Sequence, residues 1–332
     1  VGPRTGRPDS GSQRAHAGRS DGCRGSRDSR RQTSVGRIMK LARVRDAAGE
    51  CFWAQVDESA REVQRIRAPF EVWAPVVADQ GDAALELDAR RLPLAELQLC
   101  PPVNPGARVF GVGLNYLSHL VRLGRKQAPP HTLAYIKPAS ALVPPGGEIQ
   151  YPAVTNQLDY EVELVAVVAR AFGDEPQASA CLLGYTVGND ISARDAGKQL
   201  GSLDLFTQKA LDSTAPIGPW ITTLDEFGGP GQPCVTLSLR INGEERQHDT
   251  TDQMIFPVDE LLNYVDARIA LRPGDLVFTG STCGVGLEDG RFLQPGDVIE
   301  AQIERIGVLR NRIGAKRVLS PMRAIGRLGR GE

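Results

Sequence analysis

The stretch from residue 158 to residue 195 reads LDYEVELVAVVARAFGDEPQASACLLGYTVGNDISARD, and it places carboxylates beside two apolar, strand-like runs. Glu161 and Glu163 precede the run Val165 to Val168, and residues two apart in a strand share one face. The run Leu182 to Val187 breaks at Gly188-Asn189-Asp190. Like charges side by side are unfavourable on a bare strand, whereas a divalent cation reverses that balance. The pattern indicates either a metal site or a solvated strand face followed by a turn.

Further motifs occur in one order along the chain. They are Gly113-Leu114-Asn115-Tyr116 with His119, Lys137 to Leu142, Glu161-Val162-Glu163, Asn189 to Asp195, Lys209 before Ala215-Pro216-Ile217-Gly218-Pro219, Asn242-Gly243-Glu244, and Thr279-Gly280 before Gly284-Val285-Gly286. Together they resemble the fumarylacetoacetate hydrolase superfamily over roughly Val109 to Asn311. The resemblance implies a mixed α/β, β-rich fold: a β-sandwich roll of the fumarylacetoacetate hydrolase type with a small N-terminal domain. The many short strands with Pro and Gly turns agree.

The resemblance also implies roles for individual residues. Mg²⁺ is the expected cofactor, with Mn²⁺ or Ca²⁺ as alternatives. The expected metal ligands are Glu161, Glu163 and Asp190; the catalytic residues are His119, as general base on a closing segment, and Lys209; the substrate contacts are Gln247, Thr279 and Gly280.

The chain departs from the family pattern at three places. The residue three after the histidine is usually Glu in the acylpyruvate-cleaving branch and is Arg122 here, so we expect the His–Glu pair that orients a water to be missing. Gly197 replaces a usual Gln, and the turn after Phe278 reads Thr-Gly-Ser-Thr. Glu288 is a candidate for the substitute acid partner, although nothing in the sequence positions it. We hypothesise that Arg122, on the same helical face as His119, binds a distal anionic group of the substrate.

Three classes of function follow from the resemblance. The first is metal-dependent hydrolysis of a carbon–carbon bond in an acylpyruvate-like 1,3-diketo acid through a stabilised enolate. The second is a lyase or isomerase reaction on a 2-oxo acid, such as decarboxylation or tautomerisation of oxaloacetate, and Arg122 shifts weight towards it. The third is a metal-binding protein without catalysis. The expected ligand is a small anionic substrate, and the family implies a homodimer.

Composition narrows the setting of the protein. The 332 residues are 41% hydrophobic and 24% charged, which is ordinary for a globular protein. No run of 18 apolar residues exists, so we expect no membrane span. Six cysteines without CxxC spacing favour a reducing, cytoplasmic setting over a zinc ribbon or a disulfide framework.

Charge and composition also divide the chain. Residues 1–38 hold nine Arg and three Asp with almost no apolar content, so we expect a disordered leader without function rather than a nucleic-acid arm or a transit-like leader. The paired prolines Pro101-Pro102 mark a boundary. The expected parts are therefore the leader, a small N-terminal domain at 39–102, and a catalytic domain at 103–332.

Overall fold

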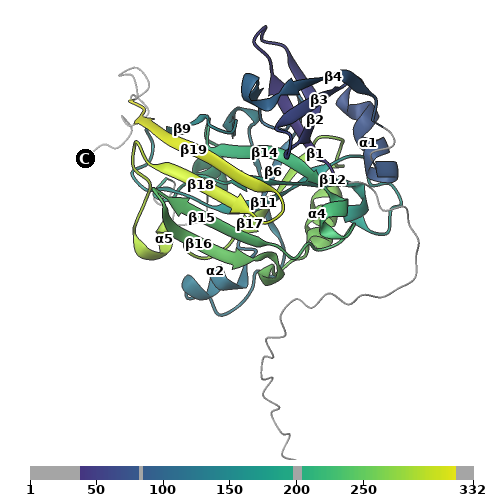
Figure 1. The fold of residues 1–332 in the computed structure, drawn as a ribbon. Coiled ribbons are helices and arrows are strands. Elements are labelled where there is room, and N and C mark those ends of the chain that lie inside the picture. Colours follow the sequence, from purple (N-terminus) through teal and green to yellow (C-terminus); the bar gives the residue numbers. More distant parts are fainter. Residues whose placement is uncertain (1–37, 82–84, 197–203, 319–332) are drawn as a thin grey trace, which may run out of the picture. The chain divides into compact units, whose positions relative to one another are not determined.

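The computed structural model describes residues 38–81, 85–196 and 204–318, so the predicted leader lies, apart from Ile38, outside the described residues. A twelve-stranded sheet has the order β4-β3-β2-β1-β14-β12-β11-β17-β6-β7, with β5 paired to β1 and β8 paired to β14 (Figure 1). Its strands are β1 Lys40–Arg45, β2 Cys51–Asp57, β3 Glu62–Ile66, β4 Leu87–Pro93, β5 Gln98–Leu99, β6 Val109–Gly113, β7 Leu133–Lys137, β8 Leu142–Val143, β11 Val162–Val168, β12 Leu182–Asn189, β14 Ala215–Thr223 and β17 Leu276–Ser281.

A second sheet of five strands has the order β16-β15-β18-β19-β9, and β10 pairs with β13. These strands are β9 Glu148–Tyr151, β10 Leu158–Asp159, β13 Ser192–Ala193, β15 Thr236–Ile241, β16 Glu244–Thr250, β18 Val298–Ile303 and β19 Gly307–Lys316. The helices are α1 Phe70–Gln80, α2 Leu117–Arg122, α3 Leu205–Lys209, α4 Val258–Asp266 and α5 Gly286–Asp289. None of the described helices combines the length and apolar character needed to cross a membrane. The predicted mixed α/β, β-rich class is confirmed.

Strand β11 is buried on both of its faces. Val162 and Leu164 belong to one apolar core together with Leu237 and other side chains of the five-stranded sheet. Val165, on the opposite face, belongs to a second core that includes Trp73 of α1. Because successive strand residues alternate between faces, an uninterrupted apolar run is what a strand between two packed layers requires. Burial on both sides makes this strand a rigid support for the acidic residues at its start.

The N-terminal segment extends the central sheet. Strand β1 pairs antiparallel with β14, with Leu41 opposite Ile221. On β2, Trp53 packs against Phe70 and Trp73 of α1, with ring centroids 5.1 Å and 5.4 Å away. The segment therefore shares its backbone hydrogen bonding with the rest of the sheet, and a domain boundary at residue 102 stays a prediction.

Two turns of the form Leu-x-Pro-Gly-Asp lead towards strands, and their aspartates differ in burial. Asp275, before β17, is buried and accepts hydrogen bonds from the Arg108 N–H at 3.0 Å, Arg108 Nε at 3.1 Å and the Arg272 N–H at 2.8 Å. Asp297, before β18, is half-buried and accepts from the Gln294 N–H at 2.8 Å and Asn242 Nδ2 at 2.9 Å. The same motif therefore provides a matched pair of sites.

Asp275→Ala is expected to lower the free energy of unfolding by about 2–4 kcal/mol, because it removes a buried acceptor of several hydrogen bonds and leaves their donors unpaired. Asp297→Ala removes bonds that water replaces, so its expected cost is below about 1 kcal/mol. Urea unfolding of the two variants measures the difference. Equal losses of unfolding free energy in the two variants would show that the burial of Asp275 does not increase its contribution to stability.

Candidate active site

Three carboxylates converge at one end of the central sheet. Strands β11 and β12 run antiparallel, so Glu161, just before β11, lies beside Asp190, just after β12; the Asp190 N–H donates to the Glu161 carbonyl at 2.8 Å. One ligand oxygen from each of Glu161, Glu163 and Asp190 lies within 4.8 Å of the others, and all three residues are buried. The structure thus brings together the carboxylates that the sequence singled out, while their role as metal ligands stays a prediction.

Buried cations surround these carboxylates. The contacts are Lys209 with Asp190 (2.6 Å) and Glu161, Lys137 with Asp190 (2.6 Å), and Arg194 with Asp159 (2.8 Å) and Glu161. Tyr135 donates its hydroxyl to Asp190 as well. Two of these donors come from strand β7, where Tyr135 and Lys137 are two residues apart and therefore point to the same face. Lys137 belongs to one of the sequence motifs, but the motif does not show its role. No sequence pattern singled out Tyr135.

The protonation preferences of the carboxylates differ. Burial alone would raise the pKa of Asp190. The ammonium groups of Lys137 and Lys209 lower it by more than burial raises it, so the pKa of Asp190 lies below its usual range. Burial raises the pKa of Glu163, and the neighbouring Asp190 and Glu161 add to that rise, so its pKa lies well above its usual range. Glu163 is therefore the member of the group whose charge is least compensated.

The hydrogen bonding of Glu163 tests whether a cation fits. Its Oε2 accepts from the Gly280 N–H at 2.7 Å, but its Oε1 is buried and has no hydrogen-bond partner. A buried carboxylate oxygen without a donor is costly, and a hard divalent ion satisfies such oxygens. Mg²⁺, Mn²⁺ or Ca²⁺ would therefore fit among Glu161, Glu163 and Asp190.

His119 has a carboxylate partner, Glu288, which was a candidate from the sequence but could not be positioned by it. Its Nδ1 lies 2.8 Å from Oε1 of Glu288 on α5, and the other carboxylate oxygen of Glu288 accepts from the Gly284 N–H at 2.8 Å. Both side chains are nearly buried. The expectation that this chain lacks a His–Glu pair is therefore wrong: the acid comes from a helix 169 residues further along the chain, not from position 122.

Arg122 does not lie where the sequence hypothesis placed it. It is exposed at the end of α2 and is not among the residues that line the cavity, whereas His119 on the same helix is buried and lines it. The residue that reaches the cavity beside His119 is Arg125, just after the helix. Because α2 spans only Leu117–Arg122, the chain has left the helix before it reaches Arg125 and no longer follows the helical spacing.

The cavity next to the carboxylates has a volume of about 170 Å³. His119, Glu161, Arg194 and Lys209 supply its charged and titratable wall, and Arg125, Gln208 and Ser281 add further polar groups. The rest of the lining is Val112, Gly113, Leu114, Leu123, Leu133, Leu205 and Leu287. One cavity therefore combines His119, which is predicted to be the general base, with Lys209 and with Glu161 of the acidic group.

The predicted substrate contacts at Thr279 and Gln247 are engaged in the protein interior. Thr279 donates its hydroxyl to the Leu164 carbonyl at 2.9 Å. Gln247 accepts from the Val162 N–H at 3.0 Å and donates to Ser281 Oγ at 3.0 Å, so it ties β16 to β11 and β17. Neither lines the cavity, and Ser281, two residues after Thr279, does. The pairing of β17 with β11 is irregular between Phe278 and Ser281, so the alternation that would put Thr279 and Ser281 on one face does not hold there. Substrate contacts by Thr279 and Gln247 stay predictions.

Gly280 acts through its backbone. Its N–H donates to Glu163, its φ is +97°, and a Cβ there would lie 2.7 Å from Cβ of Asn115. Only glycine adopts this conformation readily and leaves that space open. Gly280 therefore orients a carboxylate of the acidic group and does not itself line the cavity. Gly197, where the family usually has Gln, lies outside the described residues.

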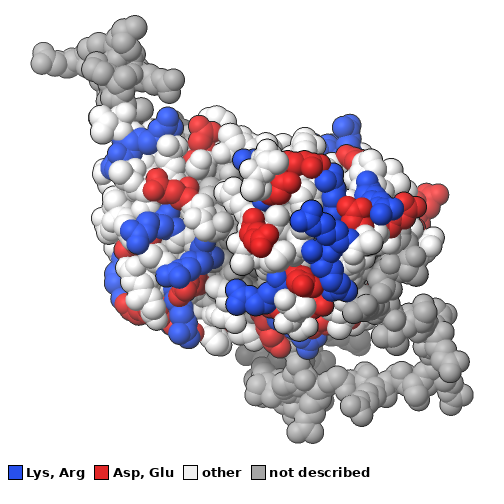
Figure 2. All heavy atoms as spheres, turned by 45° about the horizontal axis from the view of Figure 1, so that its top comes forward, with Lys and Arg blue, Asp and Glu red and all other residues white. Residues whose placement is uncertain are grey.

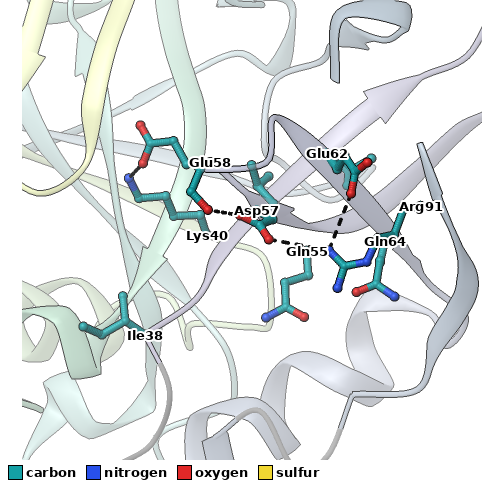
Figure 3. A pocket seen from close by; sticks show the side chains of 11 residues that line it. Ile38, Lys40, Gln55, Asp57, Glu58, Glu62, Gln64 and Arg91 are labelled. Carbon is teal, nitrogen blue, oxygen red and sulfur yellow. Dashed lines mark hydrogen bonds and ion pairs between the residues drawn. The ribbon is translucent and has the colours of Figure 1, made fainter. Parts of the chain in front are cut away.

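A second hollow, of about 320 Å³, lies on strands β1 to β4, away from these residues (Figure 3). Its charges pair with one another: Lys40 with Glu58, and Arg91 with Asp57 at 3.5 Å and Glu62 at 3.6 Å. Figure 2 shows acidic and basic side chains interspersed over one face of the molecule. This hollow holds none of the predicted site residues, so we do not regard it as catalytic.

Comparison with known proteins gives the same assignment as the motifs. The family model described as "Fumarylacetoacetate (FAA) hydrolase C-terminal" matches residues 108–314. Oxaloacetate tautomerase FAHD2A from Bos taurus is 32% identical over 246 residues, which cover 71% of this chain and 77% of that protein. The chain therefore belongs to the fumarylacetoacetate hydrolase family, as predicted.

Two solved structures show the range of activities among its relatives. Fumarylpyruvate hydrolase from Pseudomonas aeruginosa, solved with Mn²⁺ and pyruvate, matches with a TM-score of 0.57 and 35% identity over 66% of this chain and 92% of that one. A 5-carboxymethyl-2-hydroxymuconate delta-isomerase from Mycobacterium smegmatis matches with a TM-score of 0.68 and 29% identity over 84% of this chain and 100% of that one. Relatives thus include a hydrolase, an isomerase and a tautomerase, and the family is enzymatic.

Proposed function

We propose that this protein is a divalent-metal-dependent hydrolase that cleaves the carbon–carbon bond of an acylpyruvate-like 1,3-diketo acid, giving a carboxylic acid and pyruvate. The observation that carries this choice is the His119–Glu288 pair at 2.8 Å, in which His119 lines the same cavity as Glu161. Hydrolysis needs an activated water, and a histidine oriented by a carboxylate is the arrangement that activates one.

The pair sets the roles of the two imidazole nitrogens. The Glu288 carboxylate accepts the proton on Nδ1, which leaves a lone pair on Nε2. Nε2 can then take a proton from a water in the cavity as that water attacks the acyl carbonyl carbon. The bond between the acyl carbon and the adjacent CH₂ group breaks, and its electron pair passes to the pyruvate enolate, which a proton then converts to pyruvate.

Lys209 would stabilise the negative charge that develops on the enolate oxygen. Burial lowers its pKa, but Asp190 and Glu161 raise it more, so the net pKa is raised and the side chain is charged at neutral pH. Ser281 also lines the cavity, with its hydroxyl donated to the Val162 carbonyl at 3.0 Å. Glu161, Glu163 and Asp190 would hold the divalent ion, which when bound supplies a Lewis acid for the enolate. The support for Mg²⁺ or Mn²⁺ is the unpartnered Glu163 oxygen, together with the Mn²⁺ in the solved relative.

A second candidate is tautomerisation or decarboxylation of oxaloacetate, or a related isomerisation. It is favoured by the 32% identity to an oxaloacetate tautomerase. This reaction would use the same contacts to the 2-oxo acid group and consumes no water. It therefore does not need the His119–Glu288 pair to activate a water. That the protein is a cytoplasmic homodimer stays a prediction.

A substrate panel separates the candidates. We expect acetopyruvate and longer acylpyruvates to release pyruvate in the presence of Mg²⁺ or Mn²⁺, and to release none after exhaustive chelation. The same preparations are assayed for keto–enol conversion and decarboxylation of oxaloacetate. Metal-dependent turnover of oxaloacetate without acylpyruvate cleavage would replace the first candidate with the second, and turnover of neither would contradict both.

A further inference from the structure

The helix that carries Glu288 has no local cap at its start. Helix α5 spans only Gly286–Asp289, and Val285 before it makes no side-chain capping bond. A helix of one turn is not stable by itself, and the N–H groups of its first turn need acceptors from elsewhere. The position of Glu288 beside His119 therefore depends on contacts from other parts of the chain.

Asp159 supplies the missing acceptors. It is fully buried and lies 127 residues before Gly286 in the chain. Its Oδ1 accepts from the Gly286 N–H at 2.6 Å, and its Oδ2 accepts from the Leu287 N–H at 3.0 Å. A side-chain oxygen that binds the first N–H groups stabilises the start of a helix. The fit is close, because a Cβ on Gly286 would lie 2.8 Å from Asp159 Oδ1.

The same carboxylate holds Arg194, a residue of the cavity wall. Arg194 Nε donates to Asp159 Oδ2 at 2.8 Å, and another nitrogen of the guanidinium donates to Glu161. Asp159 does not line the cavity itself, but it binds α5 directly and reaches the acidic group through Arg194. Loss of a carboxylate that orients such groups from behind typically costs roughly ten- to a hundredfold in activity or metal affinity.

Building on the proposed function, we propose that Asp159 is the positioning residue of the His119–Glu288 pair. Asp159 fixes the N–H groups of Gly286 and Leu287, and Glu288 is the next residue. The Glu288 carboxylate is thereby held where it keeps the proton on Nδ1 of His119 and leaves Nε2 free to accept one from water. Asp159 acts through Glu288 and not on the substrate, because it lies outside the cavity lining.

Two substitutions disturb this anchor from opposite sides. Asp159→Asn keeps the size of the side chain but replaces an acceptor oxygen with a donor, which then faces another donor from α5 or Arg194. Gly286→Ala leaves the carboxylate in place but takes its space, and the new Cβ would also lie 2.6 Å from the Arg291 carbonyl. Asp275→Asn is the matched control: Asp275 is also buried, also binds backbone N–H groups and an arginine, and does not line the cavity.

The imidazole of His119 reports the result without any substrate. NMR of protein with ¹⁵N-labelled histidine, in the presence of Mg²⁺, distinguishes a proton on Nδ1 from one on Nε2, and a His119→Gln variant assigns the signal. We expect the proton on Nδ1 in wild type and in Asp275→Asn, and a shift towards Nε2 in Asp159→Asn and Gly286→Ala. In those two variants kcat for acylpyruvate cleavage should fall about tenfold or more, with KM within about a factor of three.

Thermal unfolding identifies the variants that fold, and if Asp159→Asn does not, Gly286→Ala decides the question. An unchanged His119 signal and kcat in the folded variants would overturn the role of Asp159 and leave the proposed hydrolysis standing. The same proton shift in Asp275→Asn would also overturn it, because a general loss of stability would then explain the effect. Expected NMR shifts in a protein that cleaves no acylpyruvate would contradict the proposed reaction and support the positioning of His119 by Asp159.

Discussion

Glu288→Gln is expected to lower kcat for acylpyruvate hydrolysis by about a hundredfold or more, with little change in KM, because general base catalysis contributes roughly 10²–10⁴-fold. The substitution keeps the shape of the side chain and an oxygen for the Gly284 N–H. It removes the carboxylate that holds a proton on Nδ1 of His119. An amide facing Nδ1 can also donate to it, which places the imidazole proton on Nε2 and blocks the base.

The chain provides a matched control for this change. Glu245 lies 3.4 Å from Nδ1 of His248, but both side chains are exposed, 42% and 60% respectively. Glu245→Gln therefore removes a His–Glu pair of the same composition outside the cavity, and kcat should stay within a factor of two. If Glu288→Gln behaves like Glu245→Gln, His119 is not the base. If it lowers kcat while oxaloacetate tautomerisation is unaffected, the pair acts on the water and not on the enolate.

Glu163→Gln is expected to abolish metal-dependent activity and, in the metal-free protein, to raise Tm at pH 8 by several degrees. The variant removes a buried carboxylate whose charge is uncompensated, and in a domain of this size about 1 kcal/mol corresponds to 2–4 °C. Because the folded-state pKa of Glu163 lies above its unfolded value, its stabilising contribution is full below the unfolded pKa, about 4.3, and is lost as pH rises through the folded pKa.

The gap in Tm between variant and wild type should therefore widen from pH 5 to pH 8. Differential scanning calorimetry of chelator-treated protein at both values measures it, with the exposed Glu96→Gln as the control. A variant less stable than wild type at pH 8 without metal would show that Glu163 is compensated by a partner other than a cation.

Local sequence patterns were sufficient for the parts of the structure that depend on neighbours along the chain. The apolar run after Glu163 predicted a buried strand, and the Asn242-Gly243 turn, with both φ angles positive, joins β15 to β16 as a hairpin. The three carboxylates were also predictable, because two lie two apart beside one strand and the third ends the strand paired with it.

Contacts between distant segments could not be read from the sequence. Glu288 on α5 reaches His119 on α2, and no spacing rule links residues 169 positions apart. The sequence also did not show that the Gln247 amide points into the interior, where it accepts from β11 and donates to β17. Helix α2 ends at Arg122, and Arg125 beyond its end lines the cavity; helix ends are the least certain feature of a sequence pattern.

We expect Glu161, Glu163 and Asp190 to hold one divalent ion. Titration of chelator-treated protein with Mn²⁺ in a calorimeter tests it without reference to any substrate. We predict one ion per chain in wild type, and an affinity at least about a hundredfold lower in Glu163→Gln, because one of three charged ligands and its unpartnered oxygen are lost. Wild type that binds no ion, or a Glu163→Gln variant that binds Mn²⁺ as tightly as wild type, would contradict the claim.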